Sequence, residues 1–276
     1  CTSSLAIALG DFPWQEGDKL IISHMEHHAL SRWYHKLQRD KGVQGIIIPR
    51  CNIDSKDGQD GPLDLNKLEE ELQKGKVRMV AMTMASNVTG EILPYRQVLQ
   101  LCRQYGVLCL LDGAQTVGVL RINIKELDPD ILVFAGHKGT LGPHGIGGLY
   151  ISKRVSMSCP TAVCEYIPGQ KGPPSIFPSY CDSGSAPMMA MAGLVAGMKW
   201  LTEQGWDQLQ SHRIQLVRQL RSGLAQIITD NGPIQIVGAA TEEWDDYTGA
   251  VSIIVTTTND GNTNATTTTT TTTTTT

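Results

Sequence analysis

The sequence predicts an α/β fold, in which a mainly parallel mixed sheet lies between helices and is followed by a smaller α+β domain. Two observations favour this fold class. Short apolar runs rich in β-branched residues alternate with amphipathic segments as far as Ile151, as expected where helical crossovers connect parallel strands. From Ala186 onward the pattern changes to long helical stretches rich in Ala, Met and Leu.

Six apolar runs in the first part have the length of a strand, and three segments between them place apolar residues on one helical face. Asp64 stands where a helix would start, and Gly106 stands where one would stop. The predicted strands are Lys19–Ser23, Val43–Pro49, Val77–Met84, Val107–Asp112, Ile131–Ala135 and Gly147–Ile151. The predicted helices are Ala29–Asp40, Leu65–Gln73 and Tyr95–Tyr105.

The second part predicts two helices, Pro187–Thr202 and Leu209–Ile227, and two strands, Ile234–Val237 and Ala250–Val255. The chain then ends in uninterrupted threonine, which buries too little apolar surface to offset its ordering entropy, so we expect disorder there. The expected organisation is a large domain over 1–185, connecting helices over 186–232, the truncated start of a small domain over 233–258, and a disordered tail over 259–276.

Composition narrows the class of protein. A formal net charge of −4 and a pI near 6.0 argue against a nucleic-acid partner, because such proteins usually present a basic face. The seven cysteines show no C-x-x-C spacing, which favours reduced thiols in the cytoplasm. No apolar stretch approaches the roughly 20 residues of a membrane span, and no leader opens the chain. We expect a soluble cytoplasmic protein.

Polar side chains follow two neighbouring predicted strands. Asp112 ends the run Leu110–Asp112, and Lys138 follows the strand Ile131–Ala135. Open α/β sheets bind ligands at the carboxyl ends of their strands, so both residues are candidates for a site. The alternative interpretations are a helix cap for Asp112 and a solvated loop lysine for Lys138. A lysine desolvated at such an edge would instead have a lowered pKa and nucleophilic character.

Other ligand classes fit the sequence less well. The glycines around Lys138 match neither G-x-G-x-x-G nor the P-loop pattern G-x-x-x-x-G-K-[ST], which argues against a dinucleotide or a nucleoside triphosphate. The histidines in His24–His28 do not have the spacing of a zinc site, so we predict no metal.

Four blocks of residues resemble the class V aminotransferase family of fold-type-I pyridoxal-phosphate (PLP) enzymes, and within it the cysteine desulfurase and selenocysteine lyase branch. The blocks are specific together, because they occur in the family's order and approximate spacing. They are Met25–Ala29, Ser86–Gly90, Asp112–Gln115 and Gly136–Lys138. The resemblance implies a three-layer PLP-dependent transferase fold, similar to aspartate aminotransferase.

The resemblance also implies catalytic roles. Lys138 would form the Schiff base with the PLP aldehyde, and Asp112 would pair with the pyridine nitrogen and keep it protonated. His27 would stack on the ring and move protons. Gln115 would donate to the phenolic oxygen of the ring, and Asn87 would lie near the ring and the substrate carboxylate. Asn87 could otherwise simply form an Asx-turn before Gly90.

The remaining implied contacts are with the cofactor phosphate. Thr2 and Ser3 stand where the family places a hydroxyl at a helix start, and His137 would be another donor. Ser185 resembles the hydroxyl that family members lend to the phosphate of the neighbouring subunit, which implies a homodimer.

Three departures from the family pattern stand out. Ala135 occupies a position where many relatives carry a phosphate-binding serine. The stretch Pro160–Gly172 does not look like the glycine-rich segment of relatives. The threonine tail stands where the family's C-terminal region would supply a substrate-binding arginine and, in desulfurases, a mobile-loop cysteine. These departures, with the abrupt start at Cys1, indicate a fragment of a longer protein.

Three functions remain open at this stage. The first is a cysteine desulfurase-like lyase, which removes sulfur from cysteine to give alanine and passes it to a nucleophilic thiol of an acceptor protein. No cysteine of the chain aligns with the family's nucleophile, and Cys164 is the remaining substitute. The second is an aminotransferase or another PLP-dependent lyase on the same core. The third is a catalytically inactive PLP-binding fragment.

Overall fold

A computed structural model of the chain describes residues 1–51, 61–155, 185–227, 234–237, 248–257 and 266–273. Its main element is a six-stranded sheet in the order β2-β1-β3-β4-β5-β6. Neighbouring strands are parallel except β5 and β6, which are antiparallel. The strands are β1 (Lys19–Ser23), β2 (Gln44–Ile48), β3 (Val77–Thr83), β4 (Leu108–Asp112), β5 (Ile131–Ala135) and β6 (Gly147–Ile151).

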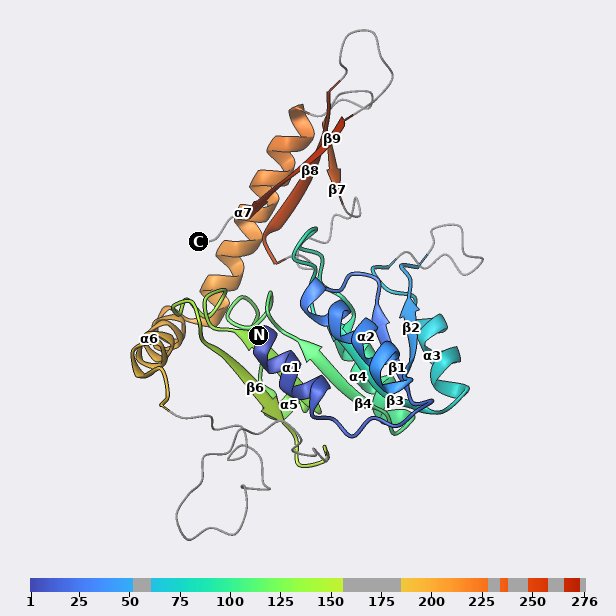
Figure 1. The fold of residues 1–276 in the computed structure, drawn as a ribbon. Helices are drawn as coiled ribbons and strands as arrows, with labels where there is room; N and C mark the ends of the chain where they lie inside the picture. The colour runs from blue at the N-terminus through green and yellow to red at the C-terminus, as the bar shows by residue number, and fades with distance from the viewer. Residues whose placement is uncertain (52–60, 156–184, 228–233, 238–247, 258–265, 274–276) are drawn as a thin grey trace.

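Helices cover both faces of this sheet, which gives three layers (Figure 1). On one face, α1 (Thr2–Gly10) and α2 (His28–Lys41) share a core with Leu110. On the other face, α3 (Leu65–Gln73), α4 (Tyr95–Gln104) and the short α5 (Ile124–Leu127) share a second core with Leu111. Successive strand residues point to opposite faces, so adjacent leucines of β4 contribute to different cores.

Local sequence signals explain where several of these helices begin and end. The Asp64 carboxylate accepts a hydrogen bond from the Lys67 backbone N–H at 2.8 Å and caps α3. Gly42 ends α2 in the left-handed conformation, with φ of 65°, as a C-terminal glycine does. These helices therefore start and stop close to the positions that the sequence predicts.

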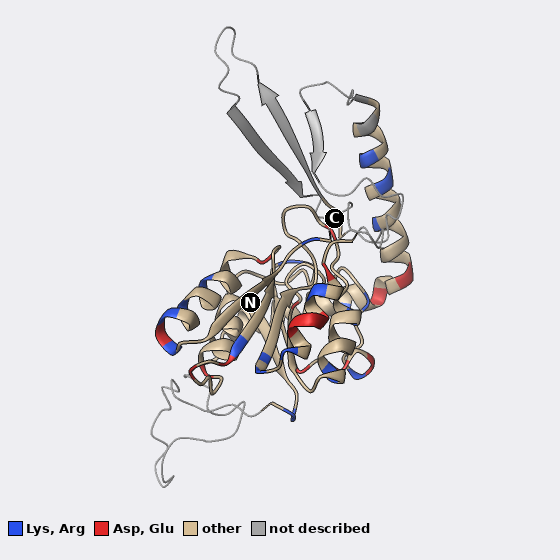
Figure 2. Cartoon of the chain, turned by 90° about the vertical axis from the view of Figure 1, so that its right-hand side faces the viewer, with Lys and Arg blue, Asp and Glu red and all other residues tan. Residues whose placement is uncertain are grey.

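The second part of the chain begins with two helices, α6 (Met188–Gln204) and α7 (Trp206–Ile227). They lead to a separate antiparallel sheet in the order β7-β8-β9, which lies beside α7 (Figure 1). Its strands are β7 (Ile234–Val237), β8 (Ala250–Thr257) and β9 (Thr266–Thr273). The backbone N–H of Thr248 donates to the Gly90 carbonyl at 2.8 Å and joins this part to the large sheet's loops. Figure 2 shows basic positions along α7.

The predicted fold class is confirmed, and two helices and one strand were missed. Neither α1 nor α5 was predicted, because α1 lacks a one-sided apolar pattern and α5 has only four residues. Within the tail, for which the sequence predicts disorder, the structure pairs Thr266–Thr273 with β8. Threonine is β-branched and favours extended backbone, which suits it to pairing with a neighbouring strand. Of the described helices, none is long and apolar enough to cross a membrane.

Candidate active site at the carboxyl ends of β4 and β5

Lys138 and Asp112 come together because their strands are parallel neighbours. Asp112 is the last residue of β4 and pairs with Val133 of β5, so both strands end at the same edge of the sheet. Asp112 is buried, with only 2% of its surface exposed. Lys138 is half-buried in the turn that follows β5. The two candidates therefore lie within electrostatic reach of each other.

The turn that presents Lys138 is held by short backbone hydrogen bonds. The Leu141 N–H donates to the Lys138 carbonyl at 2.8 Å, and the Gly142 N–H donates to the Gly136 carbonyl at 2.7 Å. The Thr140 hydroxyl also donates to the Gly136 carbonyl at 2.8 Å. The lysine side chain thus extends from a well-anchored loop, which limits the positions that its amine can take.

Burial shifts both charged groups toward their neutral forms. It raises the pKa of Asp112, while the Ala114 N–H bond at 2.9 Å and the positive charge of Lys138 act in the opposite direction. Burial also lowers the pKa of Lys138, and the Asp112 charge opposes that shift. The pair consequently combines a carboxylate that needs a cationic partner with an amine that loses its proton more readily than an exposed lysine.

His27 enters the same site from the N-terminus of α2. Its Nδ1 accepts a hydrogen bond from the Ala29 N–H at 3.1 Å, so the imidazole itself caps the helix. Burial lowers its pKa, with smaller contributions from His28 and Lys138 in the same direction, while Asp112 opposes them. A neutral imidazole whose Nδ1 accepts carries its proton on Nε2. The free nitrogen is therefore a hydrogen-bond donor.

The start of α1 lies beside this group. The Cys1 thiol donates to Asp112 Oδ1 at 3.3 Å, and the next two residues, Thr2 and Ser3, are exposed at the first turn of the helix. His137 is exposed and stacks on His144, with ring centroids 4.4 Å apart. Desolvation and the neighbouring His144 and Lys138 lower the pKa of His137. Hydroxyl, backbone N–H and imidazole donors are thus gathered at one end of the site.

Three further candidates, Gln115, Asn87 and Ser185, lie in loops outside the strands and helices. Gln115 and Asn87 are half-buried in the segments that follow β4 and β3, and Ser185 is exposed just before α6. Within the described residues, no hydrogen bond joins any of these three side chains to Lys138 or Asp112. The predicted cysteine Cys164 and the stretch Pro160–Gly172 lie outside the described residues.

The family model for class V aminotransferases matches residues 1–259. The chain belongs to this family. A cysteine desulfurase of Dickeya dadantii is 30% identical over 231 residues, which are 82% of this chain and 54% of that protein. This class V aminotransferase chain therefore spans about half the length of that curated relative.

Two solved structures resemble this class V chain. An apo cysteine desulfurase from Thermococcus onnurineus NA1 has a TM-score of 0.76 and 24% identity, over 91% of this chain and 61% of that one. A C-DES mutant with glycine covalently linked to its PLP cofactor has a TM-score of 0.72 and 23% identity, over 92% and 65% of the two chains. At these identities the similarity establishes the fold.

The structure adds Glu26 to the residues around the candidate site. This residue belongs to the family block Met25–Ala29, but the sequence by itself indicates no role for it. Glu26 precedes His27, and its carboxylate accepts hydrogen bonds from the Thr83 N–H at 3.0 and 2.9 Å. Burial raises the pKa of Glu26 to about 8, and the Asp112 charge adds to the shift. Its position inside the block Met25–Ala29 was the available signal, but its partner is 57 residues away.

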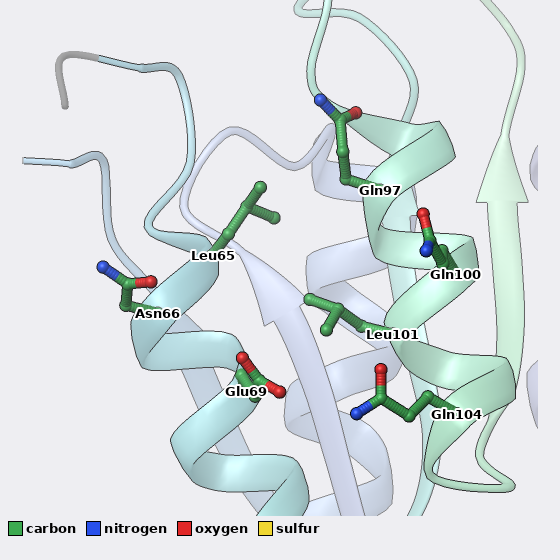
Figure 3. A pocket seen from close by; sticks show the side chains of 7 residues that line it. All are labelled: Leu65, Asn66, Glu69, Gln97, Gln100, Leu101 and Gln104. Atoms are coloured by element: carbon green, nitrogen blue, oxygen red, sulfur yellow. The ribbon is translucent and has the colours of Figure 1, made fainter.

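A groove between α3 and α4 lies apart from the class V site. It has a volume of about 230 Å³ and is lined by polar side chains such as Glu69, Gln97 and Gln104 (Figure 3). It contains none of the candidate residues. No cluster of three or more His, Cys, Asp or Glu side chains suited to a metal occurs in the described part of the chain.

Proposed function

We propose that this chain is the cofactor-binding part of a PLP-dependent, cysteine desulfurase-like enzyme, which removes sulfur from cysteine to give alanine. The observation that supports it most directly is the pairing of Lys138, an amine with a lowered pKa, with the buried Asp112 at adjacent strand ends. An amine that deprotonates readily can attack an aldehyde, and a buried carboxylate can hold a pyridinium proton. The residues present therefore fit PLP.

Each end of the cofactor has candidate partners. Lys138 would bind the aldehyde carbon, Asp112 the pyridine nitrogen, and His27 would lie against the ring. When bound, PLP would withdraw electrons from the bonds to the substrate's α-carbon. Asp112 has to stay ionised for this, and the Ala114 N–H bond and the charge of Lys138 favour the ionised carboxylate against the effect of burial.

The phosphate would lie at the start of α1, with Thr2, Ser3 and His137 as donors. Ala135 has no side-chain donor to offer there, so we assign the contacts to these three residues and to backbone N–H groups. Gln115 would donate to the phenolic oxygen of the ring. Asn87 would contact the ring or the substrate carboxylate without adding charge.

His27 is the candidate group for proton transfer. Its Nδ1 is occupied by the Ala29 N–H at 3.1 Å, so Nε2 is the nitrogen available to a substrate. Its lowered pKa keeps most of the imidazole neutral at pH 7, and in this tautomer Nε2–H can donate a hydrogen bond to a substrate. To take up a proton at Nε2, the ring would have to release the Ala29 N–H and carry its own proton on Nδ1. The sulfur released would pass to a nucleophilic thiol of an acceptor protein.

We also infer a homodimer in the cytoplasm. The helix α6, which begins just after Ser185, exposes large apolar side chains, including Met188 at 69%, Met189 at 87% and Val195 at 64%. A contiguous apolar helix face favours a protein partner, and a second copy would bring Ser185 toward the neighbouring phosphate. Sedimentation equilibrium tests the dimer.

The described cysteines, for example Cys102 and Cys109, are free thiols, which supports a reducing compartment such as the cytoplasm.

Borohydride trapping tests the cofactor assignment. The chain is incubated with PLP, reduced, digested and analysed by mass spectrometry, alongside Lys138→Ala and the control Lys153→Ala, an exposed lysine just after β6. We expect the modified peptide to contain Lys138. Both this modification and the visible absorption band of the PLP–lysine Schiff base should be lost in Lys138→Ala and kept in Lys153→Ala. Modification of other lysines, with Lys138 unmodified in folded protein, would overturn the proposal.

Substrate assays then distinguish the three functions. Alanine formed from cysteine, with the sulfur released as sulfide when a thiol reductant is added, supports the desulfurase. Conversion of the cofactor to its amine form by an amino donor, without sulfide, identifies an aminotransferase. Cofactor bound at Lys138 without turnover in a protein extended to the length of its relatives identifies an inactive scaffold.

A further inference from the structure

The partly buried Glu26 has no part in the proposed chemistry, yet its bonds connect the strands that present the site. Its Oε1 accepts from the Ser23 N–H at 3.3 Å and from the Ser23 hydroxyl, which closes the turn between β1 and α2. Both carboxylate oxygens also accept from the Thr83 N–H at the end of β3. One side chain thus joins a local turn to a strand 57 residues away.

These bonds continue the sheet beyond its last strand pair. The register of β1 with β3 ends at Ile22 opposite Ala81, so the Thr83 N–H has no β1 carbonyl to bind. Successive N–H groups of a strand point to opposite sides, and the Met84 N–H binds the Asp112 carbonyl on the β4 side at 2.9 Å. The Thr83 N–H therefore faces β1, where the Glu26 carboxylate replaces the missing carbonyl.

Both neighbours of this bond belong to the candidate site. Thr83 pairs with Asp112 in the register of β3 with β4. His27 follows Glu26 directly and caps α2 through its Nδ1. Two interactions consequently hold His27 in place. Its imidazole caps α2, and the preceding residue, Glu26, is hydrogen-bonded to Thr83, which pairs with Asp112.

We propose that Glu26 is a positioning residue that fixes His27 relative to Asp112. Its carboxylate accepts from the Ser23 N–H and hydroxyl through Oε1 and from the Thr83 N–H through both oxygens, with the shorter Thr83 contact, 2.9 Å, at Oε2. The charged group that faces Glu26 from β4 is Asp112, while Ser23 and Thr83 present only hydroxyl and backbone groups. The donated hydrogen bonds favour the ionised carboxylate, whereas burial and the charge of Asp112 oppose it.

The bonding and titration in this proposal are independent of PLP, and only the effect on cofactor binding depends on the proposed function. Burial raises the pKa of Glu26 to about 8, so the carboxyl should ionise just above neutral pH. The new charge lies next to His27 in sequence and close to Asp112. It should therefore change the chemical environment of the His27 imidazole.

The test is a pH titration of the His27 ring resonances by NMR in the cofactor-free chain. We expect two steps in the wild type, one below pH 6.5 from His27 itself and a smaller one near pH 8 from Glu26. Glu26→Gln keeps an oxygen acceptor but cannot titrate, so it should lose only the second step. The control Glu70→Gln removes an exposed negative charge on α3 and should keep both steps. A second step that persists in Glu26→Gln would show that His27 does not sense Glu26 and would count against the positioning role.

Amide hydrogen exchange tests the positioning role. Glu26→Ala removes the acceptor of the Thr83 N–H, and we expect that amide to exchange about tenfold faster than in wild type or Glu26→Gln. The affinity for PLP should fall about tenfold in Glu26→Ala and stay near wild type in Glu26→Gln. Unchanged Thr83 exchange in Glu26→Ala would refute the positioning role. Wild-type chain that fails to bind PLP while the NMR results hold would count against the proposed function alone.

Discussion

Raising the pH should destabilise this protein through the partly buried carboxyl group of Glu26. The pKa of Glu26 is about 8 in the folded chain, against 4.5 for a free glutamate side chain, chiefly because of burial. The folded state therefore binds more protons than the unfolded state between these two values. Stability is greatest below pH 4.5 as far as this group is concerned, falls as the pH rises, and levels off above about pH 8.

The size of the effect follows from the shift. One pKa unit corresponds to about 1.4 kcal/mol, so a shift from 4.5 to about 8 corresponds to at most roughly 5 kcal/mol between the two ends of the window, because the partly exposed side chain keeps some of its hydration. The hydrogen bonds from Thr83 and Ser23 stabilise the ionised carboxylate and lower its pKa, so the value of about 8 is what remains after they have opposed the effect of burial. A change of this size is a large fraction of a typical domain's stability.

Urea unfolding of wild type and Glu26→Gln, followed by circular dichroism at several pH values from about 5 to 9, measures this difference. Titrating groups distant from Glu26 affect both proteins alike and cancel in the comparison, whereas its charge coupling to Asp112 remains part of the measured difference. We expect the free energy of unfolding of wild type to fall relative to Glu26→Gln across the window. Parallel pH profiles of the two proteins would show that the pKa of Glu26 is not raised in the folded chain and would refute this reasoning.

Three further substitutions test local packing and backbone conformation. Gly118→Ala should cost about 3 kcal/mol or more in unfolding free energy, because φ is +88° and the new Cβ would overlap the Gly139 backbone in the loop that presents the lysine. Gly106→Ala should cost only about 1 kcal/mol, since φ is +66° but no described atom lies within 4 Å of the new Cβ. Arg50→Met should cost about 3 kcal/mol, because it leaves the Glu91 carboxylate, 4% exposed, without its bidentate partner at 2.8 Å. Equal costs for the two glycine substitutions, or a neutral Arg50→Met, would contradict these packing arguments.

Strands and helices with strong local signals could be predicted almost to the residue. The predicted Lys19–Ser23, Ile131–Ala135 and Gly147–Ile151 coincide with observed strands, and Leu65–Gln73 coincides with a helix. Each combines an apolar pattern of the right period with a clear local start or stop. The threonine strand Thr266–Thr273 could not be predicted, because only pairing with β8 orders a segment that has no apolar pattern of its own.

Some residues of the candidate site could likewise be found from sequence, and others could not. Asp112 and Lys138 could be found from sequence, because each follows an apolar strand and parallel strands end at a shared edge. Glu26 could not be given a role, since its main partner, the Thr83 N–H, is 57 residues away and has no side-chain signature. The stacking of His144 on His137 was missed for a similar reason: the loop that brings the two rings together has no regular pattern.

The sequence by itself determined the α/β class, the order of most elements, the family and the residues most suited to holding PLP, because these depend on local periodicity and on motifs of fixed spacing. The tertiary structure decided how strongly each group is buried and which groups face one another. Burial and the distances between charges set whether Glu26, Asp112 and Lys138 are protonated, and neither quantity is local in sequence. The protonation states on which any chemistry at this site depends are therefore properties of the folded chain.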